Sequence, residues 1–222
     1  MEHRLSRAYR TAKLVVSKRM RRVEVPSAPH FDEQATEYFA RRVTQARNYL
    51  EYGSGGSTVL AHQHVDCLVS VESDRHFLSA VRRRLTKTSR AEAILLAVNI
   101  GLTENWGKPV FTRPTARRLK RWAAYPQAPW HLLRRRRIEP DLILVDGRFR
   151  VACVLESLLN LSDHSECTIL LDDYASRDDY KAVEEHAELL EMQGRMAVLR
   201  RKPAMSVEQC KAALLRFYAD PR

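Results

Sequence analysis

The sequence has 222 residues, of which 45% are hydrophobic and 29% are charged. A chain of this length favours one mid-sized domain over two small ones, and its apolar content excludes a wholly disordered protein. Lysine and arginine outnumber aspartate and glutamate by 38 to 27, so the formal net charge is +11. No apolar run approaches the roughly 20 residues that a membrane-spanning helix requires, which excludes a transmembrane enzyme.

The four cysteines are scattered along the chain, and none of them forms a C-x-x-C pair. This spacing indicates neither a disulfide framework nor a zinc cluster. We therefore expect reduced, mostly buried thiols in a basic, cytoplasmic protein. The cysteines are Cys67, Cys153, Cys167 and Cys210.

The first 25 residues contain eight lysines and arginines but only two acids, Glu2 and Glu24. They lack the apolar centre of a secretory signal. We expect residues 1–30 to form a basic arm or helix. Contact with anionic lipid, contact with nucleic acid, an organelle presequence and a simple solvated terminus all stay open for it. Residues 31–222 are expected to form a single domain.

Helical and strand patterns alternate along this domain. Apolar residues at helical spacing follow Asp32, a strand runs to Glu51, and a glycine-rich turn leads into a helix. Near-continuous apolar strands that alternate with helices indicate a buried parallel sheet, so we predict a doubly wound α/β fold. The later strands are expected over 67–72, 93–98, 141–146, 168–173 and 195–202, and the later helices from Asp74 and over 149–160, 178–193 and 206–218, the last with Ser206 as its N-cap.

The pattern becomes irregular between residues 102 and 140. This segment holds all three tryptophans and five of the nine prolines, together with two basic clusters. We expect it to be a lid-like insertion over the sheet. Aromatic rings mixed with cations suit single-stranded nucleic acid, but they equally suit a lid over a small acidic or glycan substrate.

The first turn and the end of the second strand carry the strongest functional signal. Gly53, Gly55 and Gly56 lie between a strand and a helix, where a missing Cβ lets the backbone approach a ligand closely. The turn does not fit a dinucleotide fingerprint, because the third glycine position falls on Thr58. Glu72, at the end of the next strand, stands where a carboxylate holds a ribose diol in open α/β sheets.

The string E-x-G-S-G-G-S-T, which begins at Glu51 and is followed by V-S-V-E-S-D, resembles the first motifs of class I S-adenosylmethionine-dependent methyltransferases. The strings N-I-G-L-T-E-N-W-G-K-P, V-D-G-R-F-R and T-I-L-L-D-D-Y resemble a group of uncharacterised bacterial methyltransferase-like proteins. The resemblance runs from about residue 32 to residue 200. It implies a Rossmann-like sheet of about six to seven strands, and S-adenosylmethionine as cofactor. One departure is Ser57, which stands at the family's third glycine.

The resemblance also implies roles for individual residues. Glu51, Gly53 and Gly55 would surround the methionine moiety and the sugar, and Glu72 would bind the ribose hydroxyls. Asn99 would meet the adenine amino group, although a loop-capping role explains this asparagine equally well. The full expected set of cofactor-binding residues is Glu51, Gly53, Ser54, Gly55, Gly56, Ser57, Glu72, Ser73, Asp74, Asn99, Ile100 and Asp146.

Asp146, Asp172 and Asp173 end two strands that the fold makes neighbours, so we expect their carboxylates to converge. Clustered carboxylates need a cation or a proton, and hard oxygen ligands suit Mg²⁺. The strings V-D-G and L-D-D-Y resemble the metal positions of sugar and catechol-like O-methyltransferases. The alternative is that Asp146 lies at the transfer site without metal, while Asp172 or Asp173 caps the next helix.

These observations favour S-adenosylmethionine-dependent O-methylation of a small molecule or glycan. Asp146 is the candidate base, and Arg148, Tyr174, Trp106 and Trp130 are candidate contacts to the acceptor. A nucleic-acid methyltransferase and a non-catalytic S-adenosylmethionine-binding protein remain as alternatives. Neither the acceptor nor the oligomeric state follows from the sequence.

Overall fold

A computed structural model describes residues 23–85, 89 and 91–222. The expected basic arm over residues 1–30 therefore lies outside the described part of the chain as far as residue 22. No helix in the described part is long and apolar enough to cross a bilayer.

The centre of the molecule is a seven-stranded sheet in the order β3-β2-β1-β4-β5-β7-β6. The first five strands in the chain run parallel to one another, whereas β7 is antiparallel to both β5 and β6. This confirms the Rossmann-like, mostly parallel sheet. The strands are β1 (Asn48–Tyr52), β2 (Cys67–Glu72), β3 (Glu92–Ala97), β4 (Leu142–Val145), β5 (Thr168–Leu171), β6 (Ala187–Gln193) and β7 (Met196–Arg201).

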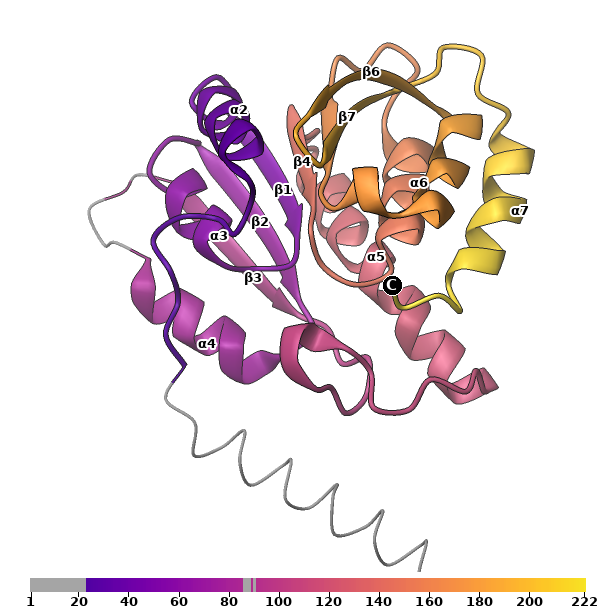
Figure 1. Ribbon diagram of the computed structural model, residues 1–222, viewed down its shortest axis with the longest axis horizontal. Coiled ribbons are helices and arrows are strands. Elements are labelled where there is room, and N and C mark those ends of the chain that lie inside the picture. Colours follow the sequence, from indigo (N-terminus) through magenta and orange to yellow (C-terminus); the bar gives the residue numbers. More distant parts are fainter. Residues whose placement is uncertain (1–22, 86–88, 90) are drawn as a thin grey trace, which may run out of the picture.

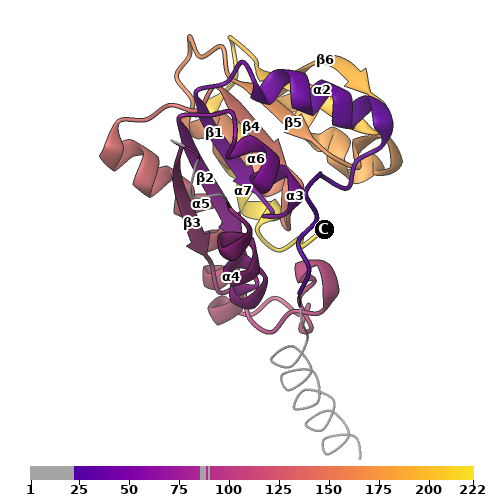
Figure 2. The same ribbon diagram turned by 90° about the vertical axis from the view of Figure 1, so that its left-hand side faces the viewer.

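Helices cover both faces of the sheet. On one face α2 (Glu33–Val43), α3 (Gly56–Ala61) and α4 (Arg75–Arg84) pack against the strands, and Figure 2 looks onto this layer. On the other face lie α5 (Ala116–Arg136), α6 (Arg150–Asn160) and α7 (Val207–Phe217) (Figure 1). The described residues also form the 3-10 helices η1 (Asn105–Gly107), η2 (Tyr174–Ser176) and η3 (Asp178–Glu185). The sheet thus lies between two helical layers.

Side-chain caps fix the starts of several helices where the sequence indicates them. Asp32 accepts from the backbone N–H of Ala35, and Asp74 accepts from that of His76, each at 2.9 Å. Ser206 caps α7 in the same way through Gln209. Such caps satisfy backbone donors that the helix leaves unpaired.

Two expectations for the elements are wrong. A helix is predicted over 178–193, but the chain forms η3 and then strand β6, which pairs with β7. As a result the sheet has a seventh strand that the sequence pattern does not reveal. The leucines and glutamates of this segment favour a helix by their intrinsic propensity, but pairing with the neighbouring strand β7 outweighs that preference.

Helix α5 corrects the expectation of a lid over residues 102–140. This 21-residue helix contains Pro126 and Pro129, yet it packs into the core with Trp122, Tyr125 and Trp130 almost wholly buried. Trp130 donates to the Tyr52 hydroxyl at 2.9 Å, and Tyr52 donates in turn to the carbonyl of Pro126 at 2.7 Å. Only the segment before residue 116 remains as a loop.

The direction in which the chain adds strands to the sheet reverses between β1 and β4. From β1 the chain continues to β2 and β3 on one side of the sheet, and from β4 it continues to β5 on the other side. Ligands of open α/β sheets bind at such a reversal, outside the carboxyl ends of the strands. Gly53 follows β1 and Asp146 follows β4, so both lie at this reversal.

Candidate active site

The glycine turn after β1 passes very close to the turn after β4. Gly53 has a φ of +96°, and a Cβ atom there would lie 2.8 Å from the backbone of Gly147. A Cβ on Gly147 would in turn lie 2.3 Å from the Tyr125 hydroxyl. Any larger residue at either position would separate the two turns, so the glycines bring the ends of β1 and β4 together.

The glycines that follow have different surroundings. None of the described residues lies within 4 Å of the place where a Cβ of Gly55 would be, so this residue faces open space among them. At Gly56 a Cβ would collide with the carbonyl oxygen of Ala28, at 1.9 Å. The segment before α2 therefore lies against the start of α3, and Gly55 is the part of the turn that a ligand can approach. Beside them, the hydroxyls of Ser54 and Ser70 share a hydrogen bond of 2.6 Å.

Glu51 is enclosed by hydroxyl groups beneath the turn. Its side chain accepts from Tyr49 at 2.9 Å, from Ser57 at 2.8 Å and from Thr58, and the residue is 0% exposed. Burial raises the pKa of Glu51, and the hydroxyl donors oppose that rise. Ser57, which departs from the family glycine, thus supplies one of the hydrogen bonds that tie the turn to Glu51.

Glu72 lies at the end of β2, as the sequence predicts. Its Oε1 accepts from the backbone N–H of Asp74 at 2.7 Å and from the Ser73 hydroxyl at 3.0 Å. Burial raises its pKa. The turn η1 lies above it, because a Cβ on Gly107 would be 2.7 Å from Ser73 Oγ and 3.9 Å from Glu72 Oε1.

A cavity of about 360 Å³ opens beside Glu72, between the ends of β2 and β3. Three of the expected cofactor residues line it: Ser73, Asp74 and Asn99. Asn99 also accepts from the backbone N–H of Gly101 at 2.9 Å, as the loop-capping alternative expects. Ile100 does not line this cavity, and its side chain is buried.

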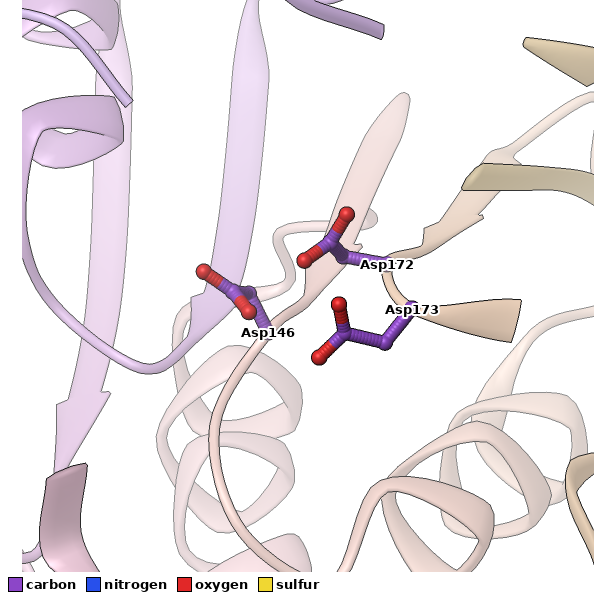
Figure 3. A group of neighbouring side chains, drawn as sticks. All are labelled: Asp146, Asp172 and Asp173. Carbon is purple, nitrogen blue, oxygen red and sulfur yellow. The ribbon is translucent and has the colours of Figure 1, made fainter. Parts of the chain in front are cut away.

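The carboxylates of Asp146, Asp172 and Asp173 converge at the ends of β4 and β5 (Figure 3). One oxygen from each lies within 4.8 Å of the others. Two arginines enter the same cluster. Arg150 contacts Asp146 at 2.9 Å and Asp173 at 3.0 Å, and Arg195 contacts Asp172 at 3.0 Å and Asp173 at 3.2 Å. Three negative groups thus face two positive ones.

This arrangement perturbs Asp146 most. Burial raises its pKa to about 7, Arg150 opposes the rise, and the neighbouring carboxylates of Asp172 and Asp173 add to it. Arg150 is itself buried, and it also donates to the backbone carbonyl of Gly147 at 3.1 Å. Asp146 therefore holds a proton more readily than an ordinary aspartate.

The four expected acceptor contacts lie in different environments. Trp106, in η1, is 80% exposed and stacks on His30 with ring centroids 6.1 Å apart. Trp130 belongs to α5 and is buried in the core, so it is not the exposed acceptor contact that the sequence predicts. Tyr174 is also buried and donates to Glu184. Arg148 is half-buried next to Gly107, and its Nε has no hydrogen-bond partner among the described residues.

The sequence reasoning missed Arg195 and the segment before α2. Arg195 lies in the turn between β6 and β7, where its backbone N–H donates to Asp32 at 2.8 Å and its Nη2 donates to the carbonyl of His30 at 2.6 Å. The same side chain holds Asp172. A signal for this hairpin is present in the sequence, because Gly194 and Arg195 lie between two short apolar segments. The helix predicted over 178–193 includes the first of these segments and therefore excludes the hairpin.

The comparisons with known proteins now bear on this geometry. No family model matches the sequence, and no curated protein matches it significantly. Among solved structures, the chain is 31% identical to a methyltransferase-like protein from Silicibacter pomeroyi DSS-3, with a TM-score of 0.73. That match covers 88% of this chain and 100% of the other. The chain belongs to the class I S-adenosylmethionine-dependent methyltransferases.

More remote structures of this methyltransferase family also match. One is the N-methyltransferase NodS from Bradyrhizobium japonicum WM9 in complex with S-adenosyl-L-homocysteine: 11% identity, a TM-score of 0.46, and coverage of 76% of this chain and 88% of the other. Another is the rRNA methyltransferase aviRa from Streptomyces viridochromogenes: 13% identity, a TM-score of 0.44, and coverage of 82% of this chain and 89% of the other.

Proposed function

We propose that this methyltransferase transfers the methyl group of S-adenosylmethionine to a hydroxyl oxygen of a small molecule or glycan. The observation that carries the choice of oxygen is Asp146, a carboxyl group with a pKa of about 7 that follows β4, where the strand order reverses. A hydroxyl acceptor needs a base, and a base works best when its pKa lies near the working pH.

The glycine turn after β1 and the residues past the ends of β2 and β3 suit the cofactor. Gly55 faces open space, which leaves room for a ligand against the backbone. Glu72 would accept from the ribose hydroxyls, and Ser73, Asp74 and Asn99 would line the adenine cavity. Glu51 would support the glycine turn rather than touch the ligand, because its side chain is fully buried and accepts hydrogen bonds from Tyr49, Ser57 and Thr58.

One local movement accompanies this assignment. The turn η1 lies over Glu72 through Gly107. A ribose bound to Glu72 would displace η1, which carries the exposed Trp106 at a φ of +61°. Trp106 and Arg148 would then border the acceptor, since Arg148 contacts the same turn.

The cofactor supplies an electrophilic methyl group on a sulfonium. The protein would hold the acceptor in line with it, because positioning provides most of the acceleration in such a transfer. As the new carbon–oxygen bond forms and the carbon–sulfur bond breaks, the hydroxyl proton would pass to the Asp146 carboxylate. Arg150, 2.9 Å from Asp146, would orient that carboxylate.

Magnesium is the point on which the two sequence hypotheses differ. The oxygen donors of Asp146, Asp172 and Asp173 suit Mg²⁺, but guanidinium groups already contact all three side chains. A metal ion would have to displace Arg150 or Arg195. We therefore propose that transfer is independent of metal, with the two arginines balancing the carboxylates.

The decisive experiment is a calorimetric titration of the protein with S-adenosyl-L-homocysteine, once with Mg²⁺ and once with chelator, with NADH as the competing dinucleotide. Equal micromolar binding under both conditions, without competition by NADH, supports the cofactor and the metal-free site. Absence of binding to a folded protein contradicts the enzymatic proposal. Methyl transfer to an acceptor panel that depends on Mg²⁺ contradicts the metal-free mechanism alone.

A nucleic-acid acceptor is the second candidate, and one observation favours it. Helix α5 carries seven arginines and lysines and no aspartate or glutamate. Binding of RNA that weakens steeply with salt, together with methyl transfer to RNA, would favour this acceptor over a small molecule or glycan. Cofactor binding without transfer to any acceptor would favour a non-catalytic protein.

A further inference from the structure

The first turns of α5 carry a concentration of positive charge that neighbouring side chains do not neutralise. Arg117, Arg118, Lys120 and Arg121 follow the N-cap Thr115, and the first turn contains no acid. Helix starts normally favour acids, because the backbone N–H groups there carry a partial positive charge. Among the described residues, Arg117 and Arg121 have neither a hydrogen bond nor an ion pair from their side chains. Their charges therefore remain available.

These arginines border a cavity of about 320 Å³. Its lining combines apolar residues with three arginines and contains no acidic residue. Arg118 is held in place, since it donates to the carbonyl of Arg113 at 2.8 Å and lies over the Phe111 ring at 5.2 Å. The lining residues are Ile100, Gly101, Leu102, Pro109, Phe111, Thr115, Arg117, Arg118 and Arg121.

This α5 cavity is distinct from the one assigned to adenine. The two share only Gly101 and Leu102, and Ser73, Asp74 and Asn99 belong to the other cavity alone. The adenine cavity is lined by Asp74 together with Arg75, whereas the α5 cavity is lined by three arginines and no acidic residue. A ligand in the α5 cavity thus needs a negative group and an apolar portion, and it lies next to a cofactor rather than in its place.

We propose that the α5 cavity binds a phosphate ester. A phosphate group offers several acceptor oxygens and one or two negative charges, and it matches guanidinium groups in geometry as well as charge. Phe111, Ile100 and Leu102 provide the apolar surface for the group that carries the phosphate. The phosphate comes either from a small phosphorylated compound or from the backbone of a single-stranded RNA, and these two sources share the chemistry of the site.

The test compares two double variants that remove the same charge from the same helix. Arg117→Gln with Arg121→Gln removes the cations of the α5 cavity. Arg135→Gln with Arg137→Asn removes two exposed cations at the other end of α5, where asparagine suits the left-handed backbone of residue 137. Both variants are titrated with inorganic phosphate and with a ten-nucleotide oligouridylate at several salt concentrations. Arginine Nε resonances report the phosphate titration, and calorimetry reports the oligonucleotide.

If the proposal holds, the Arg117/Arg121 variant loses at least tenfold in affinity and its salt dependence flattens, whereas the Arg135/Arg137 variant changes less than twofold. Phosphate that shifts the Arg117 and Arg121 signals and displaces the oligonucleotide supports an isolated phosphate ester. Oligonucleotide binding without such displacement supports RNA. Equal losses in both variants, or no binding of either probe, overturn the proposal.

The outcome is independent of the proposed methyl transfer. Both variants are also titrated with S-adenosyl-L-homocysteine, which the α5 cavity does not hold. Retained cofactor binding with lost phosphate binding supports the separate α5 cavity, and simultaneous loss of both in a folded protein contradicts it. Absence of cofactor binding in the unaltered protein, with phosphate still bound, contradicts the proposed function alone.

Discussion

Replacement of Glu72 by alanine tests the cofactor assignment most directly. The carboxylate uses Oε1 to accept from the Asp74 N–H and the Ser73 hydroxyl. Its second oxygen has no hydrogen bond within the described residues, so it is the one that a ribose hydroxyl would approach. Hydrogen bonds to a charged group contribute about 1.5 to 3 kcal/mol. Glu72→Ala should therefore weaken the binding of S-adenosyl-L-homocysteine roughly 10- to 150-fold.

The assay is calorimetric titration, accompanied by urea unfolding to show that the variant folds. Glu72→Gln keeps an oxygen for the Asp74 N–H but removes the charge, so it should retain more stability than alanine and still bind the cofactor more weakly. Glu92→Gln is the matched control, because Glu92 is an exposed acid at the start of β3 that pairs with Arg136. Unchanged affinity in a folded Glu72→Ala protein would refute the ribose assignment.

Three further predictions concern the carboxylate cluster and the glycine turn. Asp146 has a folded-state pKa of about 7 against 3.8 ordinarily, so the folded protein binds more protons than the unfolded chain between these values, and stability should fall as pH rises through them. Between pH 4 and pH 8, the free energy of unfolding of the Asp146→Asn variant, measured with urea, should therefore rise by up to about 4 kcal/mol relative to that of the unaltered protein. Parallel pH profiles of the two proteins would contradict this. Arg150→Met removes a buried cation from one buried and two half-buried carboxylates and should cost about 3 kcal/mol, whereas Arg200→Met breaks an exposed pair and should cost less than about 1 kcal/mol. Equal losses would contradict the role of Arg150. Gly56→Ala places a methyl group against a backbone carbonyl and should lower the melting temperature by several degrees, while Gly55→Ala should melt normally and weaken cofactor binding; the reverse pattern would contradict the assigned roles.

The sequence predicts the parallel half of the sheet well for a simple physical reason. Strands buried on both faces appear as short, nearly continuous apolar runs, and β2, β4 and β5 each lie within a residue or two of the expected bounds. Helix starts follow the same logic, because Asp32, Asp74 and Ser206 cap the helices that they precede.

The failures come from contacts between distant parts of the chain. The helix α5 tolerates Pro126 and Pro129 because buried partners such as Tyr52 anchor it, and no local pattern shows those partners. Strand β6 exists because β7 lies beside it. For the site, the expected pairing of β4 with β5 predicts that Asp146, Asp172 and Asp173 converge. Arg195 could not be predicted, because it lies in the turn of the hairpin that β6 and β7 form.

Arg195 also determines where this fold can change in length. Its backbone and side chain bind Asp32, His30 and Asp172, which belong to two segments far from it in the chain. The neighbouring Gly194 leaves no room for a Cβ, because one would lie 2.2 Å from Asp32. An insertion into the turn between β6 and β7 would therefore disturb the carboxylate cluster.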